Sequence, residues 1–324
     1  MSLKTKLTGW RKALYVTGNV FGSIIVTVFT IIALLNVIKF AVYTEYYSIR
    51  EIVCTNNGLR DNYVSQGTAI TDDGKYIITS GYMSDKTDSR IYITEIATDK
   101  AHPVKVLRSD GKVNKSHFGG VAVNGDTIYL AGDNSIHTVS LSEALEKDEV
   151  VMEFLFESET EASYVFCSPE HIYVGEFHDG NDYVTDTEII YNGVTYHAMF
   201  EQYTYGNYDK PIAVYALRNK VQGLAFDDKG NALISASYGL DSSDFYFYRK
   251  ESIVDAQTTY NDCPLYVLEK FDKRLVGPAM GEDLDFLNGK FYTNFESACN
   301  KYVYGKFFTN ADKIVALDFS RYSK

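Results

Sequence analysis

Three side chains in this sequence have residue types and contexts that suit proton transfer. His117 lies two residues before Gly119, at the start of a predicted strand; Glu282 opens another predicted strand and Glu296 follows the strand after it. Histidine changes charge near neutral pH, so His117 with Glu282 or Glu296 is a candidate acid/base pair. The competing interpretation, which we favour, is that His117 hydrogen-bonds the backbone at a strand start. The sequence therefore contains weak catalytic candidates but no confident catalytic set.

Three loops combine aromatic and polar side chains in a way that suits ligand binding. The loops at 80–93 and 236–248 resemble each other, since each places Tyr among Ser, Gly and Asp directly after an apolar strand. Together with the loop at 295–302 they supply Tyr82, Tyr238, Glu296 and Tyr302. Aromatic faces and polar groups that converge would form a site for a sugar, a peptide or another polar molecule. Alternatively, the tyrosines pack between sheets and the Ser and Asp residues end strands.

The sequence lacks the motifs of several enzyme and cofactor-binding classes. The chain contains no G-x-S-x-G nucleophile motif, Walker loop, dinucleotide fingerprint or C-x-x-C pair. The four cysteines are widely spaced and could form up to two disulfides in an exported domain, or could equally be small buried hydrophobes. They are Cys54, Cys167, Cys263 and Cys299.

The net charge of −12 divides unevenly along the chain. Residues 1–43 carry +5 and the remainder carries −17, which excludes a nucleic-acid-binding domain because phosphates would be repelled. Residues 20–38 are apolar or small and uncharged, about the 20 residues that a helix needs to cross a bilayer. The sequence predicts a cytoplasmic tail at 1–14 and a transmembrane signal anchor at 15–43.

The orientation of this segment follows from the charges beside it. Four basic residues precede the apolar run and Glu45 follows it, so the positive-inside rule leaves the N-terminus in the cytoplasm and exports the rest. The predicted location is the cell membrane, with a single pass. A cleavable signal peptide is the alternative, although the run is long for one and no clear A-x-A site follows it.

A repeated pattern runs through the exported part and predicts the fold. Each copy has a small or Gly-containing start, an apolar strand, a turn with Asp, Asn or Gly, and a second apolar strand. The starts lie at Gln66-Gly67, Gly119-Gly120, near Tyr164, Gln222-Gly223 and Glu282-Asp283. Their spacing of about 44 to 59 residues is close to the period of propeller blades. We expect an all-β protein, a five- or six-bladed β-propeller preceded by a single N-terminal transmembrane helix.

The limits of the propeller are less sharply marked. Residues 44–60 form a linker with a candidate ring-closing strand at 51–56, which would pair with KIVALDF near the C-terminus, and the propeller occupies 61–324. A sixth blade could lie at 180–212, where a further Asn-Gly hairpin occurs. Residues 141–150 are the one helical candidate in this part and read as a connecting turn of helix.

The blade starts x-G-h-A-h, followed by D-x-G-x-h-h-h-S, where h is apolar, resemble the SMP-30/gluconolactonase, strictosidine synthase and paraoxonase-like β-propeller superfamily. The resemblance covers about residues 60 to 320 and implies the fold, usually with six blades. It also implies a divalent metal in the central channel, held by the residues before the strand-starting glycines. Those residues here are Gln66, Gly119, Gln222 and Glu282.

This set fits a metal poorly. Ca²⁺ wants six to eight oxygen ligands including several carboxylates, and only Glu282 supplies one. Asp283 adjoins Glu282, but strand alternation sends it away from the channel. The resemblance therefore supports the fold, while a calcium-dependent activity stays a minor alternative.

The sequence leads to one functional hypothesis and two alternatives. We expect a membrane-anchored extracytoplasmic propeller that binds a polar small molecule, a glycan, a peptide or a protein partner. The first alternative is a metal-dependent lactonase or esterase at the central channel, and the second is a structural subunit of a membrane complex. The expected ligand-binding residues are Gln66, Tyr82, His117, Gln222, Tyr238, Glu282, Glu296 and Tyr302.

Overall fold

The structure is a computed structural model, and it describes residues 9–302, 305 and 311–323. The chain forms two compact units that divide after Thr44. In the first unit, α1 (Gly9–Val42) is apolar on all sides and none of its residues is buried. Among the described residues it is the one helix long and apolar enough to cross a membrane. The same properties suit a signal anchor or a signal peptide.

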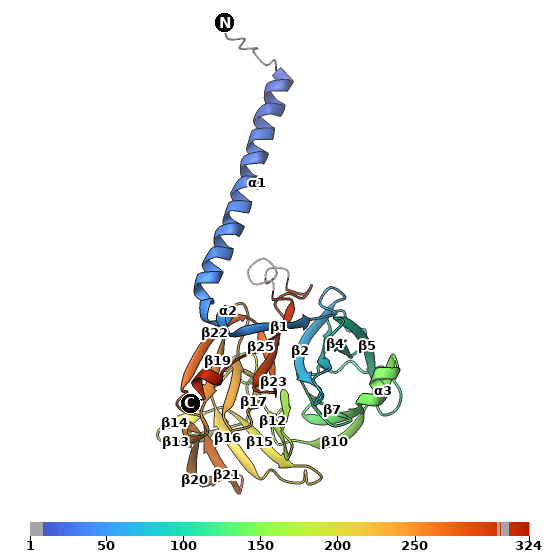
Figure 1. Cartoon of the computed structure of the whole chain (residues 1–324), viewed down its shortest axis with the longest axis vertical. Helices are drawn as coiled ribbons and strands as arrows, with labels where there is room; N and C mark the ends of the chain where they lie inside the picture. Colours follow the sequence, from blue (N-terminus) through green and yellow to red (C-terminus); the bar gives the residue numbers. More distant parts are fainter. Residues whose placement is uncertain (1–8, 303–304, 306–310, 324) are drawn as a thin grey trace. The chain divides into compact units, whose positions relative to one another are not determined.

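The second unit is a five-bladed β-propeller, shown in sequence colours in Figure 1. Blade 1 is β2 (Tyr63–Ile70), β3 (Tyr76–Met83), β4 (Arg90–Glu95), β5 (Lys100–Leu107) and β9 (Glu149–Val151). Blade 2 is β6 (Gly120–Asn124), β7 (Thr127–Gly132), β8 (Ser135–Ser140) and β10 (Glu153–Glu157). In each blade the first strand listed is the innermost, and each inner strand lies beside the inner strand of the next blade.

Blade 3 is the largest sheet. It contains β11 (Tyr164–Cys167), β12 (His171–Gly175), β15 (Ala198–Thr204) and β16 (Ala213–Leu217), extended by β21 (Cys263–Val267) and β20 (Val254–Tyr260). The hairpin of β13 (Ile189–Tyr191) and β14 (Val194–Tyr196) is a separate two-stranded sheet inserted between β12 and β15. Residues 180–212 therefore supply this hairpin and a strand of blade 3. The suggestion of a sixth blade there is wrong.

The last two blades complete the ring. Blade 4 is β17 (Val221–Phe226), β18 (Ala232–Ala236), β19 (Ser242–Tyr248) and β22 (Lys273–Ala279). Blade 5 is β23 (Gly281–Leu287), β24 (Lys290–Phe295), β25 (Lys313–Leu317) and β1 (Arg50–Thr55). β1 pairs antiparallel with β25, so blue and red strands lie side by side in Figure 1. These are the two segments whose pairing the sequence predicted to close the ring.

Tight turns and short helices connect the strands. In the turn from β23 to β24, Asn288 and Gly289 have φ of +51° and +79°, the left-handed conformation that a two-residue hairpin turn requires. The helical candidate at 141–150 is a short connecting helix, α3 (Leu141–Glu146), capped by the Ser140 side chain. The described part of the chain also contains α2 (Thr44–Ile49) and the 3₁₀ turns Lys250–Ser252 and Ser320–Tyr322.

Apolar side chains from facing sheets hold the blades together. Ile78 and Ile93 of blade 1 pack in one buried cluster with Val121 and Leu130 of blade 2. Burying each such side chain stabilises the fold by roughly 1.5–3 kcal/mol. The four cysteines are free thiols and belong to four different clusters, so the interpretation as small core residues holds over the disulfides.

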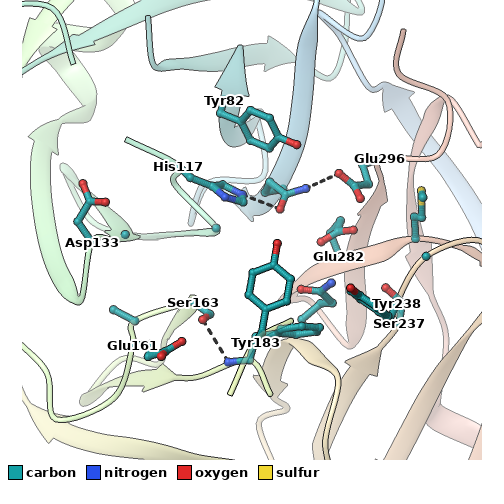
Figure 2. A pocket seen from close by; sticks show the side chains of 18 of the residues that line it. Tyr82, His117, Asp133, Glu161, Ser163, Tyr183, Ser237, Tyr238, Glu282 and Glu296 are labelled. Carbon is teal, nitrogen blue, oxygen red and sulfur yellow. Dashed lines mark hydrogen bonds between the residues drawn. The ribbon is translucent and has the colours of Figure 1, made fainter. Parts of the chain in front are cut away.

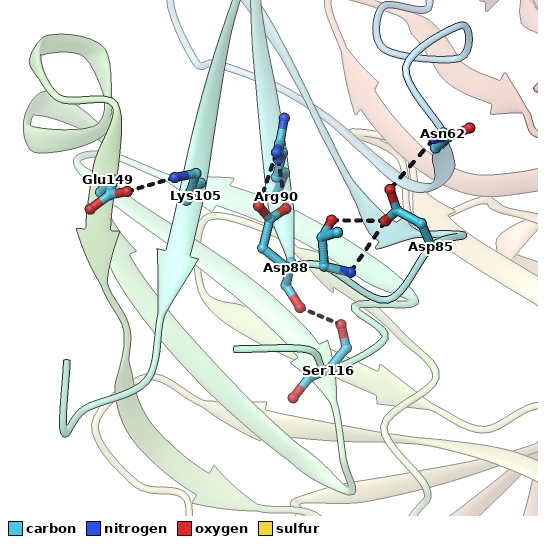
Figure 3. Close-up of polar contacts among 9 residues, drawn as sticks. Asn62, Asp85, Asp88, Arg90, Lys105, Ser116 and Glu149 are labelled. Carbon is cyan, nitrogen blue, oxygen red and sulfur yellow. Dashed lines mark hydrogen bonds and ion pairs between the residues drawn. The ribbon is translucent and has the colours of Figure 1, made fainter. Parts of the chain in front are cut away.

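Polar contacts hold the loop between β3 and β4 of blade 1 in place (Figure 3). Arg90 donates two hydrogen bonds to the Asp88 carboxylate, at 2.6 and 2.9 Å. The Ser89 hydroxyl donates to the Ser116 carbonyl oxygen at 2.6 Å. Ser116 is the residue before His117, so this contact ties the segment that carries His117 to the neighbouring blade.

Candidate functional site

Antiparallel pairing gathers the predicted site residues at one end of the ring. In each blade the start of the first strand lies opposite the end of the second, as Ser65 lies opposite Gly81 and Gly281 opposite Phe295. Residues at strand starts and residues after second strands therefore share one rim. There they surround a cavity of about 530 Å³. It is lined by all eight predicted residues: Gln66, Tyr82, His117, Gln222, Tyr238, Glu282, Glu296 and Tyr302.

Bulges in three inner strands aim side chains into this cavity. The pairing register shifts between Ser65 and Thr68 in β2, at Val221 to Gly223 in β17, and between Gly281 and Leu284 in β23. The three residues inside or beside these shifts are Gln66, Gln222 and Glu282. A bulge breaks the strict alternation of a strand and redirects a side chain, which accounts for the projection of these three polar groups.

Close backbone contacts identify a channel residue that the sequence analysis missed. A Cβ on Gly67 would lie 2.5 Å from the Val121 nitrogen in the next blade, and one on Gly120 would lie 2.6 Å from the Tyr164 Cα. Tyr164 thus occupies in blade 3 the position of the strand-starting glycine, and its preceding residue, Ser163, is the fifth channel position. Ser163 lines the cavity. Its hydroxyl accepts the Phe177 N–H at 3.1 Å (Figure 2).

A chain of hydrogen bonds links His117 to Glu296 through an amide. His117 Nε2 is 2.8 Å from Gln66 Oε1, and Gln66 Nε2 donates to Glu296 Oε2 at 2.6 Å. An amide oxygen only accepts, so Nε2 of His117 carries the proton. The two predicted partners of the acid/base pair therefore meet opposite ends of one side-chain amide and do not contact each other directly (Figure 2).

Lys301, which the sequence analysis did not single out, completes this wall. Its ammonium bonds the Tyr82 hydroxyl. It lies 4.9 Å from the Tyr82 ring centroid and 5.1 Å from that of Tyr302. The Tyr82 ring in turn packs against His117 at 4.5 Å. Desolvation of His117 by the surrounding cavity walls lowers the pKa of its imidazole, and the positive charge of Lys301 lowers it further. The imidazole is therefore neutral at pH 7.

A second aromatic cluster, made of Phe177, Tyr183 and Tyr238, forms another wall of the cavity. Of these three residues, the sequence predicted only Tyr238. Phe177 and Tyr183 come from the loop that follows β12, and their ring centroids are 5.4 Å apart in an edge-to-face arrangement. Phe177 lies 5.9 Å from Tyr238, whose hydroxyl donates to Asp182 at 2.9 Å. Figure 2 shows Tyr183 and Tyr82 projecting into the cavity from different blades.

Glu282 is the most unusual group in the cavity. It is 2% exposed, and its Oε1 has no hydrogen-bond partner in the described part of the chain. Burial, followed by the charges of Glu296 and Asp283, raises its pKa well above the usual range. Burial also raises the pKa of Glu296 to about 7, although Lys301 and the Gln66 amide oppose the shift. A buried acceptor without a partner is costly, so this one needs an explanation.

Asp283 has a different environment. It does not line the cavity, but its carboxylate points into the channel, so the prediction that strand alternation sends it away from the channel is wrong; the register shift between Gly281 and Leu284 breaks that alternation. There it accepts the Val121 N–H of blade 2 at 3.1 Å and the Leu284 N–H at 2.9 Å. Asp285 likewise accepts the Ile70 N–H of blade 1 at 2.7 Å. These two carboxylates join inner strands of different blades.

The channel positions do not form a calcium-type ligand set. They are Gln66, Gly119, Ser163, Gln222 and Glu282, with one carboxylate among them. Within the residues that the structure describes, no group of three His, Cys, Asp or Glu side chains is arranged to hold a metal ion.

Comparison with known proteins identifies no family. No family model matches the sequence, and no curated protein matches it. A solved structure of PQQ-bound aldose sugar dehydrogenase from Streptomyces coelicolor is 15% identical with a TM-score of 0.45, covering 76% of this chain and 77% of that one. A chain of a nidogen/laminin complex is 12% identical with a TM-score of 0.43, covering 81% and 78%.

A third solved structure matches with a similar sequence identity and TM-score. A putative oxidoreductase (glucose dehydrogenase) from Thermus thermophilus is 11% identical with a TM-score of 0.43, covering 83% of this chain and 99% of that one. Matches at this level assign neither a family nor a function, and the β-propeller fold rests on the strand topology. The blade-start motif that resembles the gluconolactonase superfamily accordingly indicates the fold without assigning the family.

Proposed function

We propose that this protein is a membrane-anchored extracytoplasmic propeller that binds a small polar ligand in the cavity at the channel mouth. The observation that carries this proposal is Glu282, a buried carboxyl group that faces a cavity of about 530 Å³ with an oxygen left unpartnered among the described residues. Ligand sites for small molecules have volumes of this order and few, convergent polar groups. A ligand that supplies a donor to Glu282 would remove the cost of burying it.

The lining of the cavity supports ligand binding more than catalysis. The side-chain amide of Gln66 hydrogen-bonds both His117 Nε2 and Glu296, so these three side chains form a fixed polar surface. The aromatic walls at Tyr82 and Tyr238 offer flat apolar faces beside it. The lactonase or esterase alternative would need a metal, for which the described residues offer a poor ligand set.

Thermal unfolding of the full-length protein in detergent tests the binding proposal. Neutral sugars, polyols, amino acids and amines are screened for a rise in melting temperature, because a ligand that binds only the folded state must stabilise it. We expect hits whose effect is lost in Glu282→Gln and kept in Glu201→Gln. Glu201 is a matched control, since it is also buried with an Oε1 unpartnered within the described chain, but lies in β15 and does not line the cavity.

The same assay separates the alternatives. A calcium-induced rise that EDTA reverses and Glu282→Gln abolishes would favour the metal-dependent hydrolase. A complete screen without any hit would contradict the binding proposal. Co-purification of a fixed set of partners in mild detergent would favour the structural subunit.

The proposed location rests on α1 and on the charges beside it. An epitope tag at the C-terminus of the intact protein, probed in unpermeabilised cells, should be accessible to antibody. Retention of the protein in membranes after carbonate washing distinguishes an anchor from a cleaved signal peptide. Labelling that requires permeabilisation would overturn the orientation.

A further inference from the structure

We propose that the ligand carries a protonated amine and that its ammonium group pairs with Glu282. This inference rests on the proposed binding function and names the chemical class of the ligand. It is argued from three features of the cavity: its charge, the contrast between Glu282 and Glu296, and its aromatic faces.

The lining of the cavity is predominantly acidic. Four carboxyl groups line it, whereas Lys301 is the one lysine or arginine among its described lining residues. The four are Asp133, Glu161, Glu282 and Glu296. A concave site with an excess of one sign of charge favours ligands of the opposite sign. The exported domain, at −17, adds to this preference for cations.

Glu282 and Glu296, two of the glutamates that line the cavity, differ in their partners. Glu296 accepts a hydrogen bond from Gln66, and the Lys301 charge acts favourably on it. Around Glu282, burial and the neighbouring Glu296 and Asp283 carboxylates all disfavour the ionised form. The group that would complement Glu282 is therefore a cation with N–H donors, and an ammonium supplies both.

The chain already places one ammonium group over aromatic faces of this cavity. Lys301 lies over Tyr82 and Tyr302, and Lys220, which is not a lining residue of this cavity, lies 5.5 Å from the Tyr238 ring centroid. Tyrosine faces attract cations through the ring quadrupole. The aromatic cluster of Phe177, Tyr183 and Tyr238 provides a wall on which the stem of an amine could pack while its ammonium reaches Glu282.

Matched ligand pairs test this inference with the full-length protein in detergent. The probes are glucosamine with glucose, and putrescine with 1,4-butanediol; an ammonium replaces one hydroxyl in the first pair and both hydroxyls in the second. Isothermal titration calorimetry at pH 7 gives their affinities. We expect the amine of at least one pair to bind about ten- to a hundredfold more tightly than its neutral partner, the range for a hydrogen bond to a charged group.

Two further readouts identify the residue that binds the amine. Glu282→Gln keeps the shape and removes the charge, so it should abolish the preference for the amine, while Glu201→Gln should keep it. Titration in two buffers of different ionisation enthalpy should show proton release from the wild type, because an ammonium favours ionised Glu282 over the protonated form. Neutral ligands should release no proton.

The outcomes distinguish this inference from the function on which it rests. Neutral probes that bind as tightly as the amines, or amine binding that survives Glu282→Gln, would overturn the ammonium inference and leave the binding function standing. If no probe of either pair binds and the broader screen is also negative, both are wrong. The melting temperature of each variant without ligand confirms that it is folded.

Discussion

Within strand β23, Glu282 and its neighbours Asp283 and Asp285 are buried carboxyl groups with different surroundings. Asp283 and Asp285 accept N–H groups from the inner strands of blades 2 and 1, so main-chain donors of other blades satisfy them. Glu282 adjoins Asp283 in the chain and has an oxygen with no partner in the described residues. Carboxylates that are satisfied internally have a structural role, whereas one that is left unsatisfied at a cavity is available to a ligand.

The largest expected effect is on the structural side of this comparison. Asp283→Ala removes the acceptor for the buried N–H groups of Val121 and Leu284, and each orphaned donor costs about 1–3 kcal/mol. We expect the free energy of unfolding to fall by about 3 kcal/mol, measured by urea denaturation of the full-length protein. A loss below about 1 kcal/mol would show that Asp283 does not join the blades.

A smaller loss is expected at Asp285. In Asp285→Asn one side-chain oxygen remains, so the variant can accept the N–H of either Ile70 or Phe286 but not both. We expect a destabilisation of about 1–2 kcal/mol in the same urea experiment. Asp285→Ala serves as its control and should lose more than the amide variant.

Glu282→Gln should have the opposite sign. Replacing a buried acid that lacks a counter-charge by a neutral amide should stabilise the protein at pH 8 by at least about 1 kcal/mol, while ligand binding is lost. Urea denaturation and the ligand-induced melting shift measure the two effects. Destabilisation of the empty protein would mean that Glu282 has a structural partner and would end the contrast with Asp283.

The pH dependence of that gain is the finest test. Burial raises the pKa of Glu282 above its value in the unfolded chain, so the folded state holds a proton that the unfolded state releases. The stability from this group is complete below about pH 4 and declines as pH rises through its folded pKa. The gain from Glu282→Gln should therefore shrink to below about 0.5 kcal/mol at pH 4. An equal gain at both pH values would exclude a raised pKa.

Much of the fold follows from sequence patterns because it is repetitive. The hairpin turns at Asp-Gly and Asn-Gly and the ring-closing segments at the two ends could be recognised, since each has a local signature. The number of blades could not be decided, because the β13–β14 hairpin has the same turn signature as a blade. What separates them is that β15 pairs with β12, a long-range contact without a local pattern.

The candidate site was predicted in part for the same reason. Residues anchored to a repeated strand start or end, such as Gln66 and Tyr82, could be placed on one rim from the repeat alone. Ser163 was missed because Tyr164 replaces the expected glycine, and the space for its ring comes from Gly175, where a Cβ would lie 2.1 Å from that ring. Phe177 and Tyr183 lie in an irregular loop, whose path no periodicity predicts.

The pairing of β1 with β25 bears on how the protein is made. β1 is synthesised first among the strands, but its partner lies near the other end of the chain. During synthesis the last blade therefore cannot be completed, and β1 presents unpaired hydrogen-bonding groups until the final strand arrives. Closure is a contact of very high sequence separation, which makes it slow. A nascent chain released before β25 is synthesised would keep an unpaired strand edge at β1 that can pair with other chains. A chaperone that shields strand edges would therefore act on β1 in particular.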